Sequence, residues 1–421
     1  MNQNKSVKIR FKGFTEAWEQ RKLGDLGHTY GGLSGKSKQD FGHGDARFVT
    51  YMNVFSNPIG DPCMVDSIEI DDRQSRVRKG DVLFTTSSET PDEVGMSCVW
   101  PSDSENLYLN SFCFGYRPTT KINSNFLASL LRSPSVREKI IFLAQGISRY
   151  NISKNKVMEI SIPLPSEEEQ SQIGDFFTQL DKSITLHQRK LNRFQKIRTT
   201  FLQKMFPKNG ETKPAIRLTG FNADWEQEKL QNFAVRITRK NIKKQNNRPL
   251  TISAQHGLVD QTVYFNNRVA AQDVSNYYLI KKGEFAYNRS TSKDAPVGAV
   301  RRLVDYEEGV LSTLYLVFSI TDPQHVDPNY LSYFFETTGW HSWILERAAE
   351  GARNHGLLNV SSQDFLSLPV MLPSSLEEQQ KIGEFFQKID DCIILLERQA
   401  DLLKQIKSSL LLSMFPPSNA E

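Results

Sequence analysis

Basic and amide side chains in a few polar stretches are the residues of this chain most suited to chemistry. The stretch RITRKNIKKQNNR (236–248) carries six basic residues among thirteen and no acidic residue. Further polar stretches follow at 251–257 (TISAQHG), 287–294 (YNRSTSKD) and 351–356 (GARNHG). Lys and Arg neutralise phosphates, and Arg, Asn and Gln can form paired hydrogen bonds with base edges. These stretches therefore favour binding of nucleic acid.

Similar side chains occur in the first half of the chain, in GGLSGKSK (31–38), FTTSSET (84–90) and GISRYN (146–151). Arg289 and Arg353 suit guanine, and Lys243 with its neighbours suits phosphates. Each residue alone could equally be a solvated loop side chain. The predicted DNA-binding residues are Lys36, Lys38, Ser87, Ser88, Arg149, Tyr150, Asn151, Arg239, Lys240, Lys243, Lys244, Gln255, Asn288, Arg289, Ser290, Lys293, Arg353, Asn354 and His355.

The polar stretches lie between segments that the chain repeats. Residues 9–23 (IRFKGFTEAWEQRKL) and 216–230 (IRLTGFNADWEQEKL) are identical at nine of fifteen positions in a chain of 421 residues. A repeat of about half the chain length predicts two copies of one domain, whereas a solenoid has a much shorter period. We predict that Trp18, Leu23, Trp225 and Leu230 anchor the two cores, because residues shared by both copies suit a common frame better than a contact that differs between them.

A second repeated segment predicts two long helices. Residues 164–207 and 372–416 both open on Leu-Pro-Ser and end in Met-Phe-Pro. Ser166 with Glu169, and Ser375 with Glu378, fit capping boxes at the helix starts. Apolar residues recur at steps of three and four over about five heptads, which favours a coiled coil over an ordinary core-facing helix. The predicted seam consists of Ile173, Phe177, Leu180, Ile184, Leu191, Ile382, Phe386, Ile389, Ile393 and Leu396.

The order domain, helix, domain, helix predicts how the helices run. If a twofold axis relates the copies, the second helix leads back to the first domain. We expect two antiparallel coiled-coil helices of ~60 Å joining two globular domains, an α+β (mixed α/β) fold with a pseudo-twofold internal repeat. The predicted boundaries are 1–163 and 209–371 for the two domains, and 164–208 and 372–416 for the helices.

Several of these elements together resemble the specificity (S) subunit of Type I restriction-modification systems over the full length of the chain. They are the W-E-x-x-K-L opening of each half, the KGD and KGE elements at 79–81 and 282–284, the junction leading into E-E-Q-x-x-I-G-x-F-F, and the helices ending in M-F-P. The resemblance implies two target-recognition domains that each read half of a split, asymmetric double-stranded DNA sequence, and two conserved helices that set the spacing.

The resemblance also implies a noncatalytic subunit that brings two methyltransferase (M) subunits and two restriction/translocase (R) subunits to the DNA. S-adenosylmethionine, ATP and Mg would then serve those partners, and this chain would need no cofactor. The surfaces that bind the partners are not predicted.

Catalysis by the chain itself is the rival interpretation. SNPIG (56–60) lacks the second proline and the aromatic residue of an adenine methyltransferase motif, and no GxxxxGK[ST] occurs. The seven histidines form no HExxH pair, so we expect neither an enzyme nor a metal site. A noncatalytic two-headed protein-binding scaffold would share the duplication, but it would not need basic loops in both halves. A DNA-modifying enzyme is the weaker alternative.

Bulk composition fits these expectations. The formal net charge is +4, which is compatible with nucleic acid without requiring it. The first ten residues, MNQNKSVKIR, lack the apolar region of a signal peptide, and no apolar run of membrane-spanning length occurs. We expect a bacterial cytoplasmic protein associated with the nucleoid, whose four cysteines are free thiols.

Overall fold

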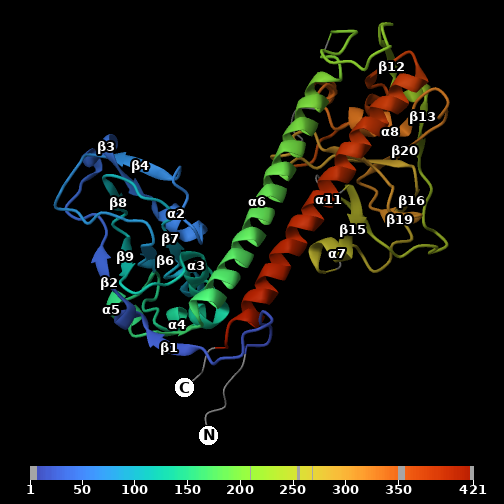
Figure 1. The fold of residues 1–421 in the computed structure, drawn as a ribbon. Coiled ribbons are helices and arrows are strands. Elements are labelled where there is room, and N and C mark those ends of the chain that lie inside the picture. Colours follow the sequence, from blue (N-terminus) through green and yellow to red (C-terminus); the bar gives the residue numbers. More distant parts are fainter. Residues whose placement is uncertain (1–6, 209, 254–256, 268, 349–355, 418–421) are drawn as a thin grey trace. The chain divides into compact units, whose positions relative to one another are not determined.

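Two compact units make up the computed structural model of the chain (Figure 1), and each contains part of both long helices. The structure describes residues 7–208, 210–253, 257–267, 269–348 and 356–417. Unit 1 comprises Met1–Arg189 and Glu397–Glu421, and unit 2 comprises Lys190–Leu396. This division cuts both long helices, whereas we predicted segments of their own for them. The predicted domain boundaries therefore stay a prediction.

The smaller elements of unit 1 lie between residues 19 and 164. Its strands are β1 (Glu19–Lys22), β2 (Gly27–Gly31), β3 (Phe41–Val49), β4 (Val65–Ile68), β5 (Val82–Thr85), β6 (Ser87–Ser88), β7 (Ser97–Val99), β8 (Leu107–Leu109), β9 (Cys113–Pro118), β10 (Tyr150–Asn151) and β11 (Ser161–Leu164). Its helices are α1 (Leu23–Leu26), α2 (Tyr51–Ser56), α3 (Ser124–Leu131), α4 (Pro134–Phe142) and α5 (Lys154–Met158), with 3-10 turns η1 (Lys38–Asp40) and η2 (Pro91–Glu93).

A four-stranded antiparallel sheet of order β2-β9-β5-β7 forms the centre of unit 1. The central strand β5 is buried along its whole length, which fits its apolar sequence VLFT. A three-stranded sheet of order β4-β3-β8 is specific to this unit, and β1 pairs with β11. The main core cluster lies between the four-stranded sheet and α3, and it includes Phe84, Phe114 and Phe126.

The smaller elements of unit 2 lie between residues 226 and 372. Its strands are β12 (Glu226–Lys229), β13 (Ala234–Ile237), β14 (Leu250–Ser253), β15 (Gly257–Asp260), β16 (Tyr278–Lys281), β17 (Phe285–Asn288), β18 (Ala299–Arg302), β19 (Glu308–Leu311), β20 (Leu316–Ile320) and β21 (Pro369–Leu372). Its helices are α7 (Gln261–Phe265), α8 (Pro328–Phe334), α9 (His341–Arg347) and α10 (Ser362–Leu366), with a 3-10 turn η3 (Leu230–Asn232).

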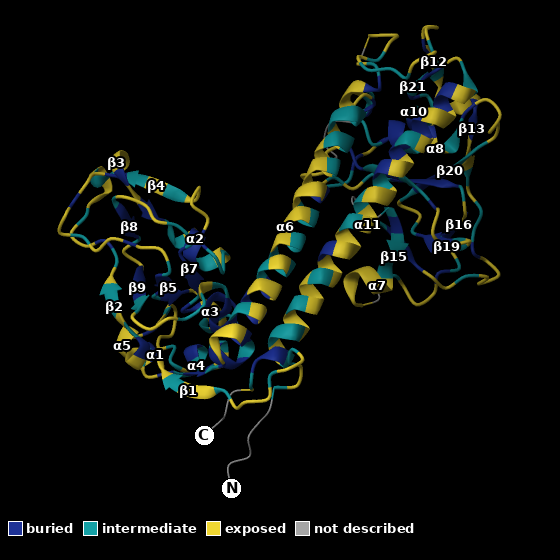
Figure 2. Ribbon diagram, viewed as in Figure 1, coloured by how far each residue is buried: buried dark blue, intermediate teal, exposed yellow. Residues whose placement is uncertain are grey.

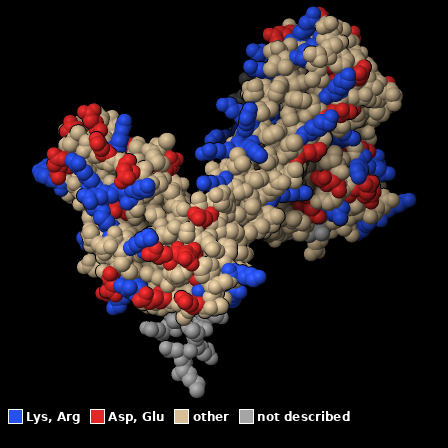
Figure 3. Space-filling model, viewed as in Figure 1, with Lys and Arg blue, Asp and Glu red and all other residues tan. Residues whose placement is uncertain are grey.

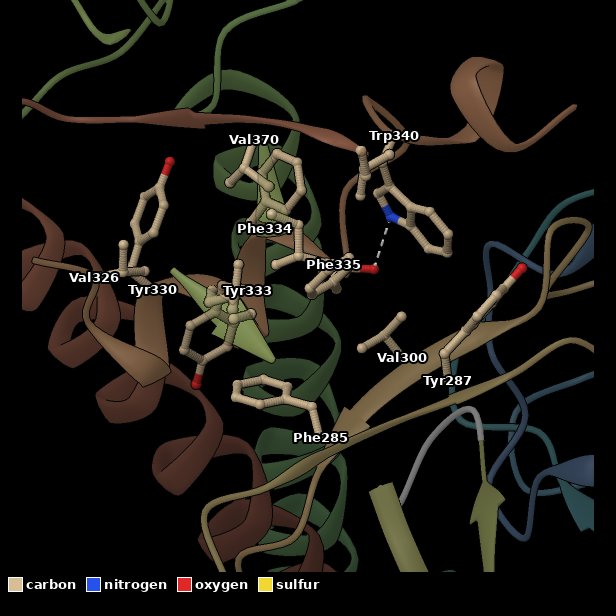
Figure 4. Close-up of a cluster of buried hydrophobic side chains, with 14 of the residues drawn as sticks. Phe285, Tyr287, Val300, Val326, Tyr330, Tyr333, Phe334, Phe335, Trp340 and Val370 are labelled. Carbon is tan, nitrogen blue, oxygen red and sulfur yellow. Dashed lines mark hydrogen bonds between the residues drawn. The ribbon is translucent and has the colours of Figure 1, made fainter. Parts of the chain in front are cut away.

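The four-stranded sheet of unit 2 repeats the strand order of unit 1. Its order is β13-β20-β17-β18, so in both units the first strand lies beside the last, followed by the second and the third. Around it, β12 pairs with β21, β14 with β15, and β16 with β19. Aromatic rings fill the core, and Phe285 stacks on Phe318 at 5.1 Å. Figure 4 shows the Trp340 indole N–H donating to the Phe335 carbonyl, at 3.1 Å.

The long helices are α6 (Glu167–Lys204) and α11 (Leu376–Met414), and they pack against each other within each unit. In unit 1, Phe177 stacks on Phe415 at 5.8 Å, and Asp181 pairs with Lys407. Residues farther along α6 therefore contact residues farther back along α11. The Arg198–Asp390 ion pair and the Phe201–Phe385 contact at 5.0 Å run in the same sense in unit 2. The two predicted antiparallel long helices are confirmed.

Burial along the helices follows the predicted seam (Figure 2). All ten seam residues have reduced exposure, whereas Ile406, which continues the apolar spacing, is exposed. Of the ten, Ile173, Phe177, Leu191, Ile382, Phe386 and Ile389 are buried, and Leu180, Ile184, Ile393 and Leu396 are half-buried.

The starts of the helices differ from the predicted capping boxes. The Ser166 hydroxyl accepts the Glu169 backbone N–H at 3.3 Å, as predicted. The Glu169 carboxylate instead accepts two hydrogen bonds from Arg10, at 2.6 and 2.7 Å, and Glu378 accepts two from Arg217, at 2.7 and 2.8 Å. Both glutamates are buried, so their charges need a fixed cationic partner more than a cap.

The Met-Phe ends of the helices complete the two cores. Phe415 contacts Trp18 at 6.1 Å in unit 1, and Phe206 contacts Trp225 at 6.2 Å in unit 2. Leu23, Trp225 and Leu230 are buried and Trp18 is half-buried against the core, which confirms the predicted anchors.

We predict that a circular permutant opened between Lys208 and Gly210, with the original ends joined, folds normally. The Ile9 N–H donates to the Ser413 carbonyl at 3.0 Å, so the two ends of the described chain run side by side in unit 1. The thermal midpoint should stay within about 4 °C of the parent value, equivalent to ~1–2 kcal/mol. A control permutant opened after the buried Leu191 should unfold at a clearly lower temperature. Equal midpoints for the two permutants would contradict the prediction.

Candidate nucleic-acid interface

The KGD and KGE elements form the same kind of turn in both units. Asp81 accepts the backbone N–H of the residue three positions earlier at 2.9 Å, and Glu284 does the same at 2.8 Å. Gly80 and Gly283 have φ values of +85° and +89°, a conformation that favours glycine. Both acidic side chains point inwards, because Asp81 and Glu284 are buried. The turn therefore places a buried carboxylate just before β5 or β17.

Each buried carboxylate holds an arginine in a two-pronged ion pair. In unit 1, Arg117 donates to the two oxygens of Asp81 at 2.8 and 2.7 Å, and the Tyr30 hydroxyl donates to the same group at 2.7 Å. In unit 2, Arg239 donates to the two oxygens of Glu284 at 2.9 and 3.2 Å. Such paired, charge-assisted bonds fix the guanidinium plane. Arg239, a predicted DNA-binding residue, is thus engaged within its own unit.

Gly115 on the neighbouring strand leaves the space that the Tyr30 ring occupies. A side chain on Gly115 would overlap the Tyr30 ring, because a Cβ built there lies 2.0 Å from a ring carbon. Burial, followed by the charge of Asp81, raises the pKa of the Tyr30 phenol. The phenol therefore remains a hydrogen-bond donor at neutral pH.

A polar cavity of about 390 Å³ opens beside Tyr30 in unit 1. Three arginines line it, and two of them come from the segment RQSRVRK (73–79), in which four of seven residues are basic. The lining residues are His28, Tyr30, Asp72, Gln74, Ser75, Arg76, Arg78 and Arg117.

Four predicted DNA-binding residues of unit 1 lie together on one pair of short strands. Ser87 pairs with Asn151, and Ser88 pairs with Tyr150. Asn151 is exposed and Tyr150 is half-buried, whereas Ser87 and Ser88 are buried and the Ser88 hydroxyl lies 3.3 Å from a Glu93 carboxylate oxygen. The serines therefore hold this strand pair, and DNA contact by any of the four stays a prediction.

The remaining predicted DNA-binding residues of unit 1 differ in their exposure to solvent and in their ion pairs. Arg149 is exposed and lies over the Phe112 ring at 5.7 Å. Lys38 is exposed on η1. Lys36 is mostly buried and pairs with Asp71 at 2.9 Å, so its charge is neutralised within the unit.

In unit 2, the segment after β17 is tied to residues far along the chain. Arg289 donates to the carbonyls of Leu314, at 3.0 Å, and of Val360, at 3.2 Å. The Asn288 side-chain oxygen accepts the Ser290 backbone N–H at 3.0 Å, and Ser290 and Lys293 are exposed. Arg289 thus braces this segment with its guanidinium instead of presenting it to solvent.

The basic run 236–248 is partly anchored and partly exposed. The Lys240 ammonium lies over the Tyr278 ring at 4.1 Å and donates to the Asn276 carbonyl at 2.8 Å. Lys243 is exposed, as is Lys244, which lies 3.6 Å from Asp273. The predicted residues Gln255, Arg353, Asn354 and His355 lie outside the described residues.

Two segments of the chain match one family profile, described as Type I restriction modification DNA specificity domain. The matches cover residues 15–196 and 222–406, most of the chain. The chain belongs to this family. It is therefore a specificity subunit that recognises DNA, and its two specificity domains fit a target in two parts.

Similar proteins agree with this assignment. A protein of Methanocaldococcus jannaschii named "Putative type I restriction enzyme MjaX specificity subunit" is 22% identical over 417 residues, covering 94% of this chain and 92% of that protein. The crystal structure of the S subunit of a Type-I restriction-modification system from M. genitalium has a TM-score of 0.61 at 15% identity, covering 98% of this chain and 100% of that chain.

A third protein shares the fold. It comes from a structural study of complex assembly and conformational transition of the type I R-M system, and it matches with a TM-score of 0.52 at 16% identity over 94% of this chain and 97% of that chain. These structural likenesses support the specificity-subunit fold.

The basic segment 73–79 was missed by the sequence-based prediction. Its signal is charge density, because four of its seven residues are Lys or Arg, against 52 of 421 in the whole chain.

In the part of the chain that the structure describes, no group of three or more His, Cys, Asp or Glu residues is arranged to hold a metal. No helix among the described residues is long and apolar enough to cross a membrane.

We predict that Arg117→Met destabilises unit 1 by about 3 kcal/mol, because it leaves the buried Asp81 charge unpaired. Urea unfolding measures the change. The matched control is Arg21→Met, which removes a half-buried surface arginine paired with the exposed Glu19 at 3.5 Å and should cost at most about 0.5 kcal/mol. Adding Asp81→Asn to Arg117→Met should restore part of the loss. Equal effects of the two single variants would show that the pair does not hold the sheet.

Proposed function

We propose that the chain is the noncatalytic DNA-recognition subunit of a type I restriction-modification complex, and that units 1 and 2 each read one half of a split, asymmetric target. The observation that carries the proposal is one frame occurring twice, with the same sheet order and the same carboxylate turn. The polar side chains around that frame differ between units. Because base contacts specify sequence, the two half-sites differ as well.

Exposed polar residues are the best candidates for direct contact with DNA. The anchored side chains Lys36, Arg239 and Arg289 instead position the segments that carry the exposed ones. The exposed candidates are Lys38, Arg149 and Asn151 in unit 1, and Lys243, Lys244, Ser290 and Lys293 in unit 2.

The partners follow from the same proposal. Two M subunits and two R subunits assemble with this chain in the cytoplasm, and S-adenosylmethionine, ATP and Mg serve those subunits. Family membership supports this assignment, as does the related structure from the study of type I complex assembly. This chain contributes DNA recognition and the spacing between the half-sites.

Base-resolution methylation mapping in cells that carry this chain with its partners tests the function. We expect one asymmetric motif of two short half-sites separated by a fixed unread gap, and we expect it to disappear when the gene for this chain is deleted. A contiguous palindromic motif would contradict the proposal that units 1 and 2 each recognise a different half-site. A methylation pattern independent of this chain would favour the protein-binding scaffold.

We predict that shortening both helices by one heptad shortens the unread gap by about three base pairs. Removing residues 183–189 and 399–405, which lie opposite each other by the Asp181–Lys407 register, removes ~10 Å of helix, and DNA rises ~3.4 Å per base pair. Methylation mapping reads the result. The control removes residues 183–189 alone, which breaks the register and should abolish methylation. New half-sites with an unchanged gap would refute the spacer role.

A further inference from the structure

The polar cavity of unit 1 is lined by arginines that are not all neutralised by ion pairs within the unit. Arg117 is held by Asp81, and its Nη2 also donates to the Arg76 carbonyl at 2.9 Å. Among the described residues, the one ion pair found for the Arg76 side chain is with Asp72, whose own side chain is 79% exposed. Arg78 is exposed, and among the described residues no ion pair of its side chain is found. Two guanidinium groups therefore face the cavity with little internal compensation.

The lining suits a phosphate better than a base. Apart from the Tyr30 ring, the walls are polar or charged, and that ring is already covered by Arg117 at 5.2 Å from its centroid. Apart from the His28 imidazole, a base therefore finds no free aromatic face for stacking. Arg76, Arg78 and His28 can all donate to an oxyanion, and guanidinium groups match the geometry of phosphate oxygens. Figure 3 shows Lys and Arg side chains gathered, with some acidic ones, over the part of unit 1 that contains β2 and β9.

Unit 2 places cations at the equivalent position but takes them from another segment. In unit 1 the cavity lies between β2, the first strand of the four-stranded sheet, and the residues just before the KGD element. In unit 2, Arg236 lies on β13, the corresponding first strand, and its Nη2 lies 3.4 Å from the Tyr278 hydroxyl, just before the KGE element. Lys240 packs on the same Tyr278 ring. The same place is thus basic in both units although the sequences there do not align.

We propose that the unit 1 cavity beside Tyr30 binds a backbone phosphate of the DNA duplex through Arg76 and Arg78, and supplies affinity without reading sequence. This assignment rests on the DNA-recognition function proposed above. Phosphate contacts fix the position of a protein on the duplex, whereas base contacts determine which sequence it prefers. Loss of the two cations therefore weakens binding to every sequence alike.

The test uses the full-length variant R76Q/R78Q and a fluorescein-labelled 30-base-pair duplex of random sequence. Both arginines are exposed, and the Arg76–Asp72 pair is a surface pair of small energetic value, so the variant should fold; its thermal midpoint checks this. The matched control R21Q/K22Q removes the half-buried Arg21 charge and the exposed Lys22 charge from β1 of the same unit. Anisotropy titrations over a series of KCl concentrations give the slope of log K against log[KCl].

We expect the slope of R76Q/R78Q to be smaller in magnitude than that of wild type by about 0.9, because the cavity holds one phosphate and each neutralised phosphate contributes about 0.9. At about 0.1 M KCl this corresponds to roughly tenfold weaker binding of the duplex by the double variant. The control should keep the wild-type slope. In cells with the partner subunits, R76Q/R78Q should methylate the wild-type motif at both half-sites, at lower occupancy.

The other possible results distinguish failure of the cavity assignment from failure of the DNA-recognition function. If wild type binds the duplex and R76Q/R78Q keeps its slope, the cavity assignment fails while the DNA-recognition function stands. If R76Q/R78Q changes the bases of the methylated motif, the cavity reads sequence and the proposal is wrong. If calorimetry shows that inorganic phosphate binds wild type and not the variant, with equal duplex affinities, the cavity serves a free anion. If wild type binds no random-sequence duplex, the cavity assignment fails; if wild type with its partners directs no methylation of an asymmetric motif in cells, the DNA-recognition function itself fails.

Discussion

A two-pronged arginine–glutamate pair fastens the opening segment of each half to the start of a long helix. Arg10 holds Glu169 in unit 1, and Arg217 holds Glu378 in unit 2. Both glutamates are buried, so without the arginine a charge would remain in the core, a penalty of several kcal/mol. The pair fixes where each helix begins within its unit. The positions of the adjoining strand pair β1–β11 or β12–β21 and of the aromatic core depend on that point.

Local and repeated sequence patterns made much of the fold predictable. Contacts between side chains far apart in the sequence could not be predicted from such patterns. Heptad spacing predicted both helices, and the repeated tryptophans predicted core anchors. The Glu169 carboxylate was predicted to cap a helix, but its partner Arg10 lies 159 residues away. The predicted contacts Ser88 and Lys36 were chosen for being polar, yet polarity alone does not distinguish a side chain facing DNA from one that pairs within the fold. Segment 73–79 carried the same signal of charge density as the run 236–248, but its sequence gives no sign that a cavity forms beside it.

The divergence between the units is confined to parts that the shared frame does not need. The four-stranded sheet has the same order in both, and its carboxylate turn holds an arginine in both, although Arg117 comes from β9 and Arg239 follows β13. The added sheets differ: β4-β3-β8 in unit 1, and the pairs β14–β15 and β16–β19 in unit 2. A recognition surface of this kind can change its side chains without disturbing the buried pairs that hold each unit together.

The composition of the two cores has a consequence for the order in which the chain matures during translation. Unit 2 is a single uninterrupted stretch, whereas unit 1 needs Met414 and Phe415, which are synthesised after all of unit 2. At ~5–20 residues per second, roughly 10 to 45 s separate the emergence of the first part of unit 1 from that of its last aromatic contact. During that interval Trp18 and Phe177 lack the Phe415 ring. The half that is made first is therefore the half that is finished last.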